Sequence, residues 1–283
     1  MLASLIIVFR EVLEAGLIIG IVMAATKGVV GRGRWVAIGI GAGIVGSCVV
    51  AWFADAISGL FADTGQELFN ACVLLVAVAM LAWHNAWMAQ HGREMARDMA
   101  AVGRAVSNGE QSLAALAVVI GVAVLREGAE VVLFLTGILA SEEGGLTTVL
   151  AGGLGGVALG ALMSALMYAG LLRIPTRHLF RVTTWLLTLL AAGMAATAMS
   201  FLAQAGVLES GGTILWDSSG ILRDKSVLGQ ALHVLIGYTD RPTEAQLAAY
   251  VATVLAILAL TRLAGGGGGK PALADRRVAN PAE

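Results

Sequence analysis

The sequence is short of charged residues. Only 13% of its 283 residues are Asp, Glu, Lys or Arg, whereas a soluble protein carries about 25%. Hydrophobic residues make up 58% of the chain and fall in long runs instead of an alternating pattern. So few charged side chains cannot cover a surface that faces water. A soluble scaffold is therefore excluded, and an integral membrane protein is predicted.

Cysteines and basic segments are scarce as well. Cys48 and Cys72 lie in or beside apolar runs, and two thiols are too few for a disulfide framework or a zinc site. Both are expected to be small packing residues. The net charge is −1, and no basic segment with interleaved aromatic residues is present. This composition argues against nucleic-acid binding.

A nucleotide-binding motif is also missing. The glycine run near the C-terminus ends at Lys270, but Pro271 follows where a phosphate loop needs Ser or Thr. Transport driven by ATP bound to this chain is therefore not expected. Residues 265–283 are expected to form a flexible cytoplasmic tail.

Seven apolar segments reach the length of about 20 residues that a membrane span needs. They cover residues 4–26, 35–57, 69–91, 113–138, 146–172, 179–204 and 246–263. An all-α polytopic membrane protein is predicted, with a single transmembrane domain over residues 1–264. The outer loop, about 205–245, contains "SVLGQALHVLIGY", which is predicted to form a short helix.

Lys and Arg are unevenly distributed between the two sides of this arrangement. Thirteen follow the first, third, fifth and seventh segments, whereas Arg223, Lys225 and Arg241 alone lie on the other side. Because positive residues are retained in the cytoplasm, the N-terminus is predicted outside and the C-terminus inside, in the cell (inner) membrane.

The connection between the third and fourth segments shows helical periodicity. Met95, Met99, Val102 and Val106 recur at helical spacing among charged residues. The pattern predicts either an amphipathic helix on the cytoplasmic membrane surface or a solvated helical linker.

Two motifs place ionisable residues inside apolar segments. The first, "VFREVLEAGLIIG" at 8–20, has a counterpart in "VLREGAEVVLFLTG" at 124–137. Three residues of the first, Arg10, Glu11 and Glu14, recur 116 positions later as Arg126, Glu127 and Glu130. In the segments that follow, Gly39, Gly41 and Gly46 match Gly153, Gly155 and Gly160 at an offset of 114.

The motifs indicate an internal duplication. Repeat A, about 1–91, and repeat B, about 113–204, each hold three spans, and the last span at 246–263 is added to them. Because three is odd, the two copies must cross the membrane in opposite senses. This is the 3+3 inverted repeat of many secondary transporters, whose substrate site lies near the midplane between the copies.

Each motif carries one carboxylate more than its arginine can neutralise. Arg10 can pair with Glu14 one turn later, and Arg126 with Glu130. An ion pair that only stabilises helix packing would explain one such motif. Two opposed copies with a summed charge of −2 instead predict a bound cation or protonated carboxylates. Carboxylates suit hard cations such as Fe(III), Mg, Mn or Ca. The candidate metal ligands are Glu11, Glu14, Glu127 and Glu130, supported by Arg10 and Arg126.

The third segment offers a possible nitrogen ligand. Met80, His84 and Met88 recur every fourth residue, and His91 follows. His84 can be read as a metal ligand or as a hydrogen-bonded core histidine. The outer loop contains several acidic residues, among them Asp217. They are expected either to attract cations or to be ordinary solvated residues.

The motifs "REVLE" and "REGAE" resemble the paired R-E-x-x-E motifs of the FTR1-type iron permeases, oxidase-dependent transporters that include bacterial EfeU-like and FtrC-like members. The similarity extends to the seven-span layout over nearly the whole chain. "REGAE" stands where "REGLE" is common, a change at an uncharged position. The acidic motif of the fungal outer loop has no clear match beyond "WDSS", which leaves Asp217 as the candidate ligand there.

The resemblance implies high-affinity uptake of iron, with iron as substrate, no bound organic cofactor, and the motif glutamates as its path. It implies that the lipid-embedded chain receives iron, as Fe(III), from an extracytoplasmic partner: an iron oxidase, a cupredoxin-like protein or a haem peroxidase, together with an iron-binding protein. Two other transport functions stay open, a permease for another divalent cation such as Pb or Mn and a proton-coupled exchanger. A membrane electron-transfer subunit would need paired haem ligands, and only His84 and His91 hint at them.

Overall fold

A computed structural model of the chain describes residues 1–59, 65–141, 145–170, 176–208, 211–224 and 226–265. These ranges hold eight helices and one isolated antiparallel bridge, between Ile214 and Thr243. The predicted tail lies almost wholly outside them. In chain order the helices are α1 Leu2–Ala25, α2 Arg32–Gly59, α3 Gln66–Ser107, α4 Ala114–Ser141, α5 Gly145–Tyr168, α6 Thr176–Gln204, α7 Val227–Ile236 and α8 Glu244–Gly265.

Each of the seven predicted apolar segments largely coincides with one long helix, which confirms an all-α fold. Within the described ranges, five helices, α2, α3, α5, α6 and α8, are long and apolar enough to cross a membrane. The two motif helices, α1 and α4, have similar lengths of 24 and 28 residues. Each of them carries three ionisable residues in its interior. Crossing by these two helices, and the orientation of the whole chain, stay predictions.

The short helix predicted in the outer loop is α7. Its first turn is capped by Ser226, whose Oγ accepts a hydrogen bond of 2.9 Å from the backbone N–H of Gly229. It ends at Gly237, whose φ of 69° lies in the left-handed region that glycine adopts without strain.

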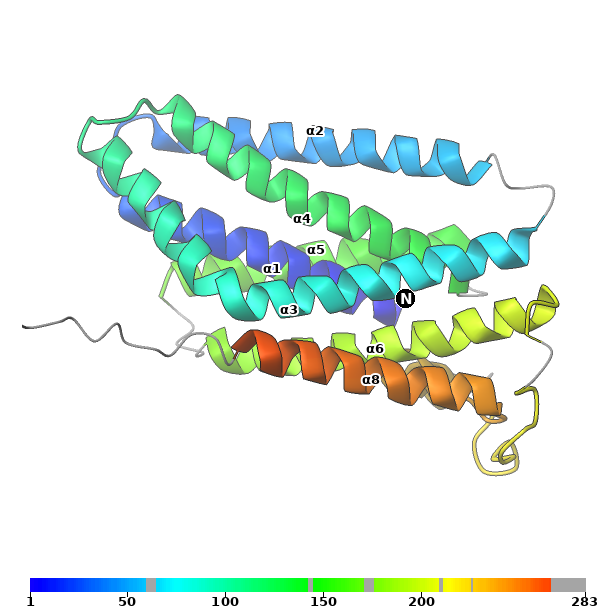
Figure 1. The fold of residues 1–283 in the computed structure, drawn as a ribbon. Helices are drawn as coiled ribbons and strands as arrows, with labels where there is room; N and C mark the ends of the chain where they lie inside the picture. The colour runs from blue at the N-terminus through cyan, green and yellow to red at the C-terminus, as the bar shows by residue number, and fades with distance from the viewer. Residues whose placement is uncertain (60–64, 142–144, 171–175, 209–210, 225, 266–283) are drawn as a thin grey trace, which may run out of the picture.

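The helices pair as an inverted repeat requires. Figure 1 shows α1 and α4 running in opposite directions, with α5 beside α1 and α2 beside α4. The first helix of each copy thus packs against the second helix of the other copy. A two-fold axis between the copies would exchange these two pairs, which supports the duplication read from the motifs.

Glycines allow the close approach within each pair. A Cβ on Gly43 of α2 would lie 2.6 Å from the Cβ of Val124 on α4, and one on Gly156 of α5 would lie 2.8 Å from the backbone nitrogen of Phe9 on α1. Both distances are too short for a real Cβ, so the backbones meet as they do at small-residue interfaces of membrane helices.

The contacts shift the predicted glycine alignment by one residue. Gly43 and Gly156 occupy equivalent places and are 113 positions apart, not 114. Gly41, which the sequence alignment matched with Gly155, has no atom within 4 Å of the place its Cβ would take. The error arose because glycines are frequent enough in both segments to align in more than one register.

Helix α3 is much longer than a single span. Its 42 residues extend over about 63 Å, roughly twice the length that a bilayer core requires. Its C-terminal third curves toward the ends of α1, α2 and α4 (Figure 1). There Met99 and Val106 pack with Val22, Val36 and Leu116. Two residues of the apolar face predicted at 95–106 therefore pack against other helices.

The main core fixes α3 beside both motif helices. Leu74, Ala77 and Leu81 of α3 are buried against Ile7 of α1, Phe134 of α4 and apolar residues of α6 and α8. Because residues three and four apart share a helix face, this stripe turns the next position, His84, toward α1 and α4.

Candidate metal site

The first motif is buried in the centre of α1. Arg10, Glu11 and Glu14 are at most 4% exposed. Their spacing places Arg10 and Glu14 on one face, one turn apart. Helix propensity does not oppose this arrangement, because Arg, Glu and Leu are good helix formers.

Arg10 neutralises much of this motif. Its guanidinium donates from Nη1 to Glu11 Oε1 at 3.0 Å and lies with Nη2 at 2.9 Å from Glu14 Oε1. The second oxygen of each carboxylate turns to α3, where His84 Nε2 lies 3.5 Å from Glu14 Oε2 and 4.0 Å from Glu11 Oε2. The arginine thus holds both glutamates in place and leaves one oxygen of each directed at the space between the helices.

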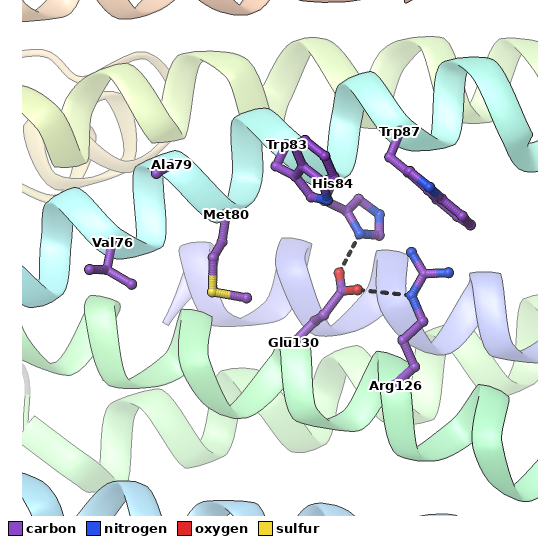
Figure 2. A pocket seen from close by; sticks show the side chains of 8 residues that line it. All are labelled: Val76, Ala79, Met80, Trp83, His84, Trp87, Arg126 and Glu130. Atoms are coloured by element: carbon purple, nitrogen blue, oxygen red, sulfur yellow. Dashed lines mark hydrogen bonds and ion pairs between the residues drawn. The ribbon is translucent and has the colours of Figure 1, made fainter.

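The second motif is arranged differently, although its spacing is the same. Arg126 donates from Nε to Glu130 Oε1 at 3.2 Å, but its side chain is 33% exposed. Its guanidinium stacks over the ring of Trp87 at 4.1 Å, and Nη1 lies 3.8 Å from the sulfur of Met95. Figure 2 shows Arg126 between Glu130 and Trp87. Arg126 therefore contacts residues of α3 as well as the glutamate of its own motif.

Glu127 is buried, and its carboxylate has no partner among the residues that the structure describes. Its side chain is 2% exposed, and neither carboxylate oxygen has a hydrogen-bond partner in the described part of the chain. Burying such a group is costly in free energy unless a cation or a proton compensates it. Among the described residues, the Glu127 carboxylate therefore lacks a compensating charge, which a bound cation or a proton would provide.

His84 joins the two motifs. Its Nδ1 is in contact with Glu130 Oε2 on α4 (Figure 2), and its Nε2 faces the glutamates of α1. The structure places His84 in the acidic cluster, which is compatible with both predictions from the sequence, a metal ligand and a hydrogen-bonded core histidine. His91 lies elsewhere: its ring stacks on Trp87 at 5.1 Å, and its Nδ1 is 3.3 Å from the Trp87 carbonyl oxygen. The two histidines therefore do not form a haem-ligand pair.

Four side chains converge on one point. Glu11, His84, Glu127 and Glu130 each offer a ligand atom, and these atoms all lie within 4.8 Å of one another. Donors around an octahedral ion held at about 2.1 Å are up to about 4.2 Å apart. Small side-chain movements would therefore bring three carboxylates and one imidazole around a single ion. Such a mixed set of oxygen and nitrogen donors suits a first-row transition metal.

Other predicted and unpredicted residues lie around this cluster. Glu14 borders it through His84, whereas Asp217 is in the connection between α6 and α7, half exposed and paired with Arg241. Sequence analysis missed Asn85, which is buried next to His84 with no hydrogen-bond partner in the described structure for either amide atom. An amide within an apolar segment was the signal that could have identified it.

A cavity of about 690 Å³ opens beside the cluster, between α3 and α4. Figure 2 shows its lining, in which His84, Glu130 and Arg126 provide the polar groups and Met80, Trp83 and Trp87 much of the rest. The cluster is thus accessible from one side through a pocket whose wall combines carboxylate, imidazole and thioether groups.

Comparison with known proteins places this chain in a family. The iron permease FTR1 family matches residues 1–264. The chain is 29% identical over 272 residues to the ferrous iron permease EfeU of Shigella sonnei, covering 94% of this chain and 98% of that protein. It is 28% identical over 285 residues to the EfeU of Yersinia pestis, covering 99% and 100%. No solved structure matches it.

The match covers both copies, the outer loop and α8, so it is not confined to the short motifs. Members of this family are transporters and not enzymes. The family resemblance carried by "REVLE" and "REGAE" is therefore confirmed, and the chain belongs to the iron permease FTR1 family.

Proposed function

We propose that this chain is an inner-membrane permease that moves iron into the cytoplasm between α1 and α4. In this proposal the chain crosses the membrane seven times, with its N-terminus outside and its C-terminus inside. The observation that carries the proposal is the convergence of Glu11, His84, Glu127 and Glu130 from three helices at the centre of a duplicated membrane fold. The family and the naming of its EfeU relatives as ferrous iron permeases support iron as the substrate.

The residues divide into ligands and supports. Glu127 has both oxygens free, and Glu11 and Glu130 each direct one oxygen inward, so these three carboxylates replace the water around the ion. Arg10 holds Glu11 and Glu14 through two contacts of about 3 Å. Arg126 orients Glu130 through a single hydrogen bond of 3.2 Å. Glu14 completes the path on α1, next to His84.

His84 makes the site selective for transition metals. Imidazole nitrogen suits iron and zinc, whereas magnesium and calcium prefer oxygen ligands throughout. A His84→Gln variant should therefore lose iron uptake by about tenfold while Mg or Ca compete more strongly than in the wild type.

The nitrogen ligand can be observed directly. Pulsed electron paramagnetic resonance of the protein loaded with Cu(II), in detergent, should show coupling to an imidazole nitrogen in the wild type and none in the His84→Gln variant. A nitrogen signal that survives this substitution would assign the coupling to another histidine and contradict the ligand role.

The form in which iron arrives is part of the proposal. Carboxylates favour Fe(III), and delivery by an extracytoplasmic oxidase, cupredoxin-like protein or peroxidase is what resemblance to the family implies. The names of the EfeU relatives specify ferrous iron instead. Uptake of radioactive iron by cells, with and without ascorbate to keep it reduced, separates the two: an oxidation-dependent permease loses uptake when ascorbate is present.

The deciding experiment is uptake of radioactive iron in cells that lack other iron importers. Glu127→Gln and Glu130→Gln should each reduce uptake by more than about tenfold, because each removes a ligand charge from the path. Unchanged uptake in both variants would contradict the carboxylate path. Competition by an excess of Mn or Pb, measured in the same cells, tests the alternative that another divalent cation is the substrate.

A further inference from the structure

A second cavity, of about 950 Å³, lies between the α1–α5 pair and the α2–α4 pair. Glu11 and Glu127 stand in its wall, so it reaches the cluster from the side opposite α3. From there it extends to Met23, Gly33 and Tyr168. These residues lie near the last turn of α1, the first turn of α2 and the last turn of α5. The cavity therefore connects the cluster with the face of the protein at which α1 and α5 end.

The first cavity lies on the α3 side of the cluster. Its α3 residues run from Val76 to Trp87, on both sides of His84. His84 and Glu130 line the first cavity and Glu11 and Glu127 the second, and no residue lines both. The side chains of the cluster therefore separate the two cavities.

We propose that the second cavity is the exit route by which the ion leaves the cluster for the cytoplasm. The inference rests on the proposed function and on its orientation, in which α1 and α5 end at the cytoplasmic face. The carboxylate of Glu127, which is buried and has no hydrogen-bond partner within the described ranges, faces this cavity. A second unpartnered polar atom, Ser164 Oγ, lies in the same wall on α5.

The chemistry of the wall suits release better than binding. Beyond the two glutamates, the polar side chains of the cavity are those of Ser47, Cys48, Ser164 and Tyr168, and the remaining lining is apolar or glycine. Ions cross a membrane protein only if the sites after the selective one hold them weakly. Hydroxyl and thiol groups without a carboxylate meet this condition, so an ion that passes Glu127 finds no second strong site before the cytoplasm.

Cys48 allows a direct test, because it lines the cavity, whereas Cys72 on α3 does not. In a Cys72→Ser background, membrane vesicles of either orientation are treated with 2-(trimethylammonium)ethyl methanethiosulfonate, a cationic thiol reagent that does not cross membranes. The exit route predicts that Cys48 reacts from the cytoplasmic face alone and that the reaction lowers iron uptake by about tenfold. A Cys48→Ser/Cys72→Ser chain, compared with its own untreated uptake, controls for other targets.

Three outcomes would overturn the proposal. Cys48 that is unreactive from both faces would mean that lipid or protein, not water, fills the cavity. Reaction from the outer face alone would assign the cavity to entry. Reaction from the cytoplasmic face with uptake unchanged would show an aqueous cavity away from the path. Labelling needs no iron, so a chain that does not transport iron at all would refute the proposed function without affecting this measurement.

Two substitutions on α5 provide a matched test of the route. Both Ala158 and Ala161 are exposed, but Ala161 lines the cavity and Ala158 does not. Ala161→Phe should obstruct the route and reduce the maximal rate of uptake by about tenfold, with iron binding to the purified protein unchanged, because the ligands are untouched. Ala158→Phe should leave the rate unaffected. Equal rates in the two variants would contradict the exit route.

Discussion

At the scale of single residues, Glu127 and Glu14 are equivalent in chemistry but not in surroundings. Both carboxylates are buried, yet Glu14 lies 2.9 Å from the Arg10 guanidinium and Glu127 has no partner in the described structure. Removing the charge of a buried paired group leaves its partner uncompensated, whereas removing that of an unpaired group relieves a cost.

This difference predicts opposite effects on stability. Glu14→Gln should lower the free energy of unfolding by about 3 kcal/mol, because Arg10 loses one of its two charged contacts. Glu127→Gln should leave stability equal or higher, while uptake falls. Thermal denaturation of the two purified variants in detergent checks this, with the wild type as reference. A Glu127→Gln chain less stable than Glu14→Gln would show that Glu127 has a structural partner.

Asp217 belongs to the loop and not to the cluster. Its carboxylate accepts hydrogen bonds from the Ser219 side chain and backbone N–H and lies 3.0 Å from Arg241 Nη2, which together lower its pKa to about 2. A pKa depressed in the folded state means that the stabilisation is present above the ordinary value of 3.8 and is lost as the pH falls through about 2.

Two measurements on Asp217→Asn follow from this pairing. Hydrogen exchange of residues 217–222 at pH 7 should become faster, since the Arg241 contact is weakened, and iron uptake at pH 7 should stay within about twofold of the wild type. The protection factors of the wild-type loop, which correct for the pH dependence of intrinsic exchange, should stay unchanged between pH 7 and pH 5. A tenfold loss of uptake in this variant would return Asp217 to the metal path.

At the scale of helices, the two glycine-lined pairs set the spacing of the fold. Gly43→Ala places a Cβ 2.6 Å from the Val124 Cβ and 2.9 Å from the Gly121 carbonyl oxygen. The resulting overpacking should cost about 1–3 kcal/mol. Gly41→Ala, two residues earlier on the same helix, has no atom within 4 Å and should be neutral or stabilising by up to about 1 kcal/mol. Melting temperatures of the two variants in detergent distinguish these effects, and a Gly41→Ala chain as unstable as Gly43→Ala would contradict the interface.

The positions of the helices along the chain could be predicted from the sequence more completely than the contacts between them. Length and hydropathy alone locate the seven long helices, because a bilayer demands long apolar runs. Motif spacing also reveals the duplication. The rotation of α3 about its axis depends on how Leu74 and Leu81 pack with residues of α1, α4, α6 and α8, and no local sequence pattern contains this information. The sequence therefore left two roles open for His84. It also predicted the continuation of α3 past residue 91 as a separate element.

At the scale of the whole molecule, topology is the prediction with the widest consequences. Gly109, between α3 and α4, and Gly212, in the outer loop, are both exposed with no atom within 4 Å, so each tolerates an inserted epitope tag. A tag at Gly109 should be accessible to antibody only after the cells are made permeable, and a tag at Gly212 in intact cells. Accessibility of both tags in intact cells would refute the odd number of spans between them.

Arg10 and Arg126 have different side-chain contacts, so neither half of the chain can form the observed site by itself. Two identical copies of one half, inserted in opposite orientations, would rebuild the helix pairs. Both arginines would then make the same contacts. Arg10 faces its own two glutamates and Arg126 turns to Trp87. The part of α6 that lies 113–116 residues after His84 reads "TAMS" and offers no imidazole. Only the first half therefore supplies a histidine to the site, so this set of ligands needs two different halves.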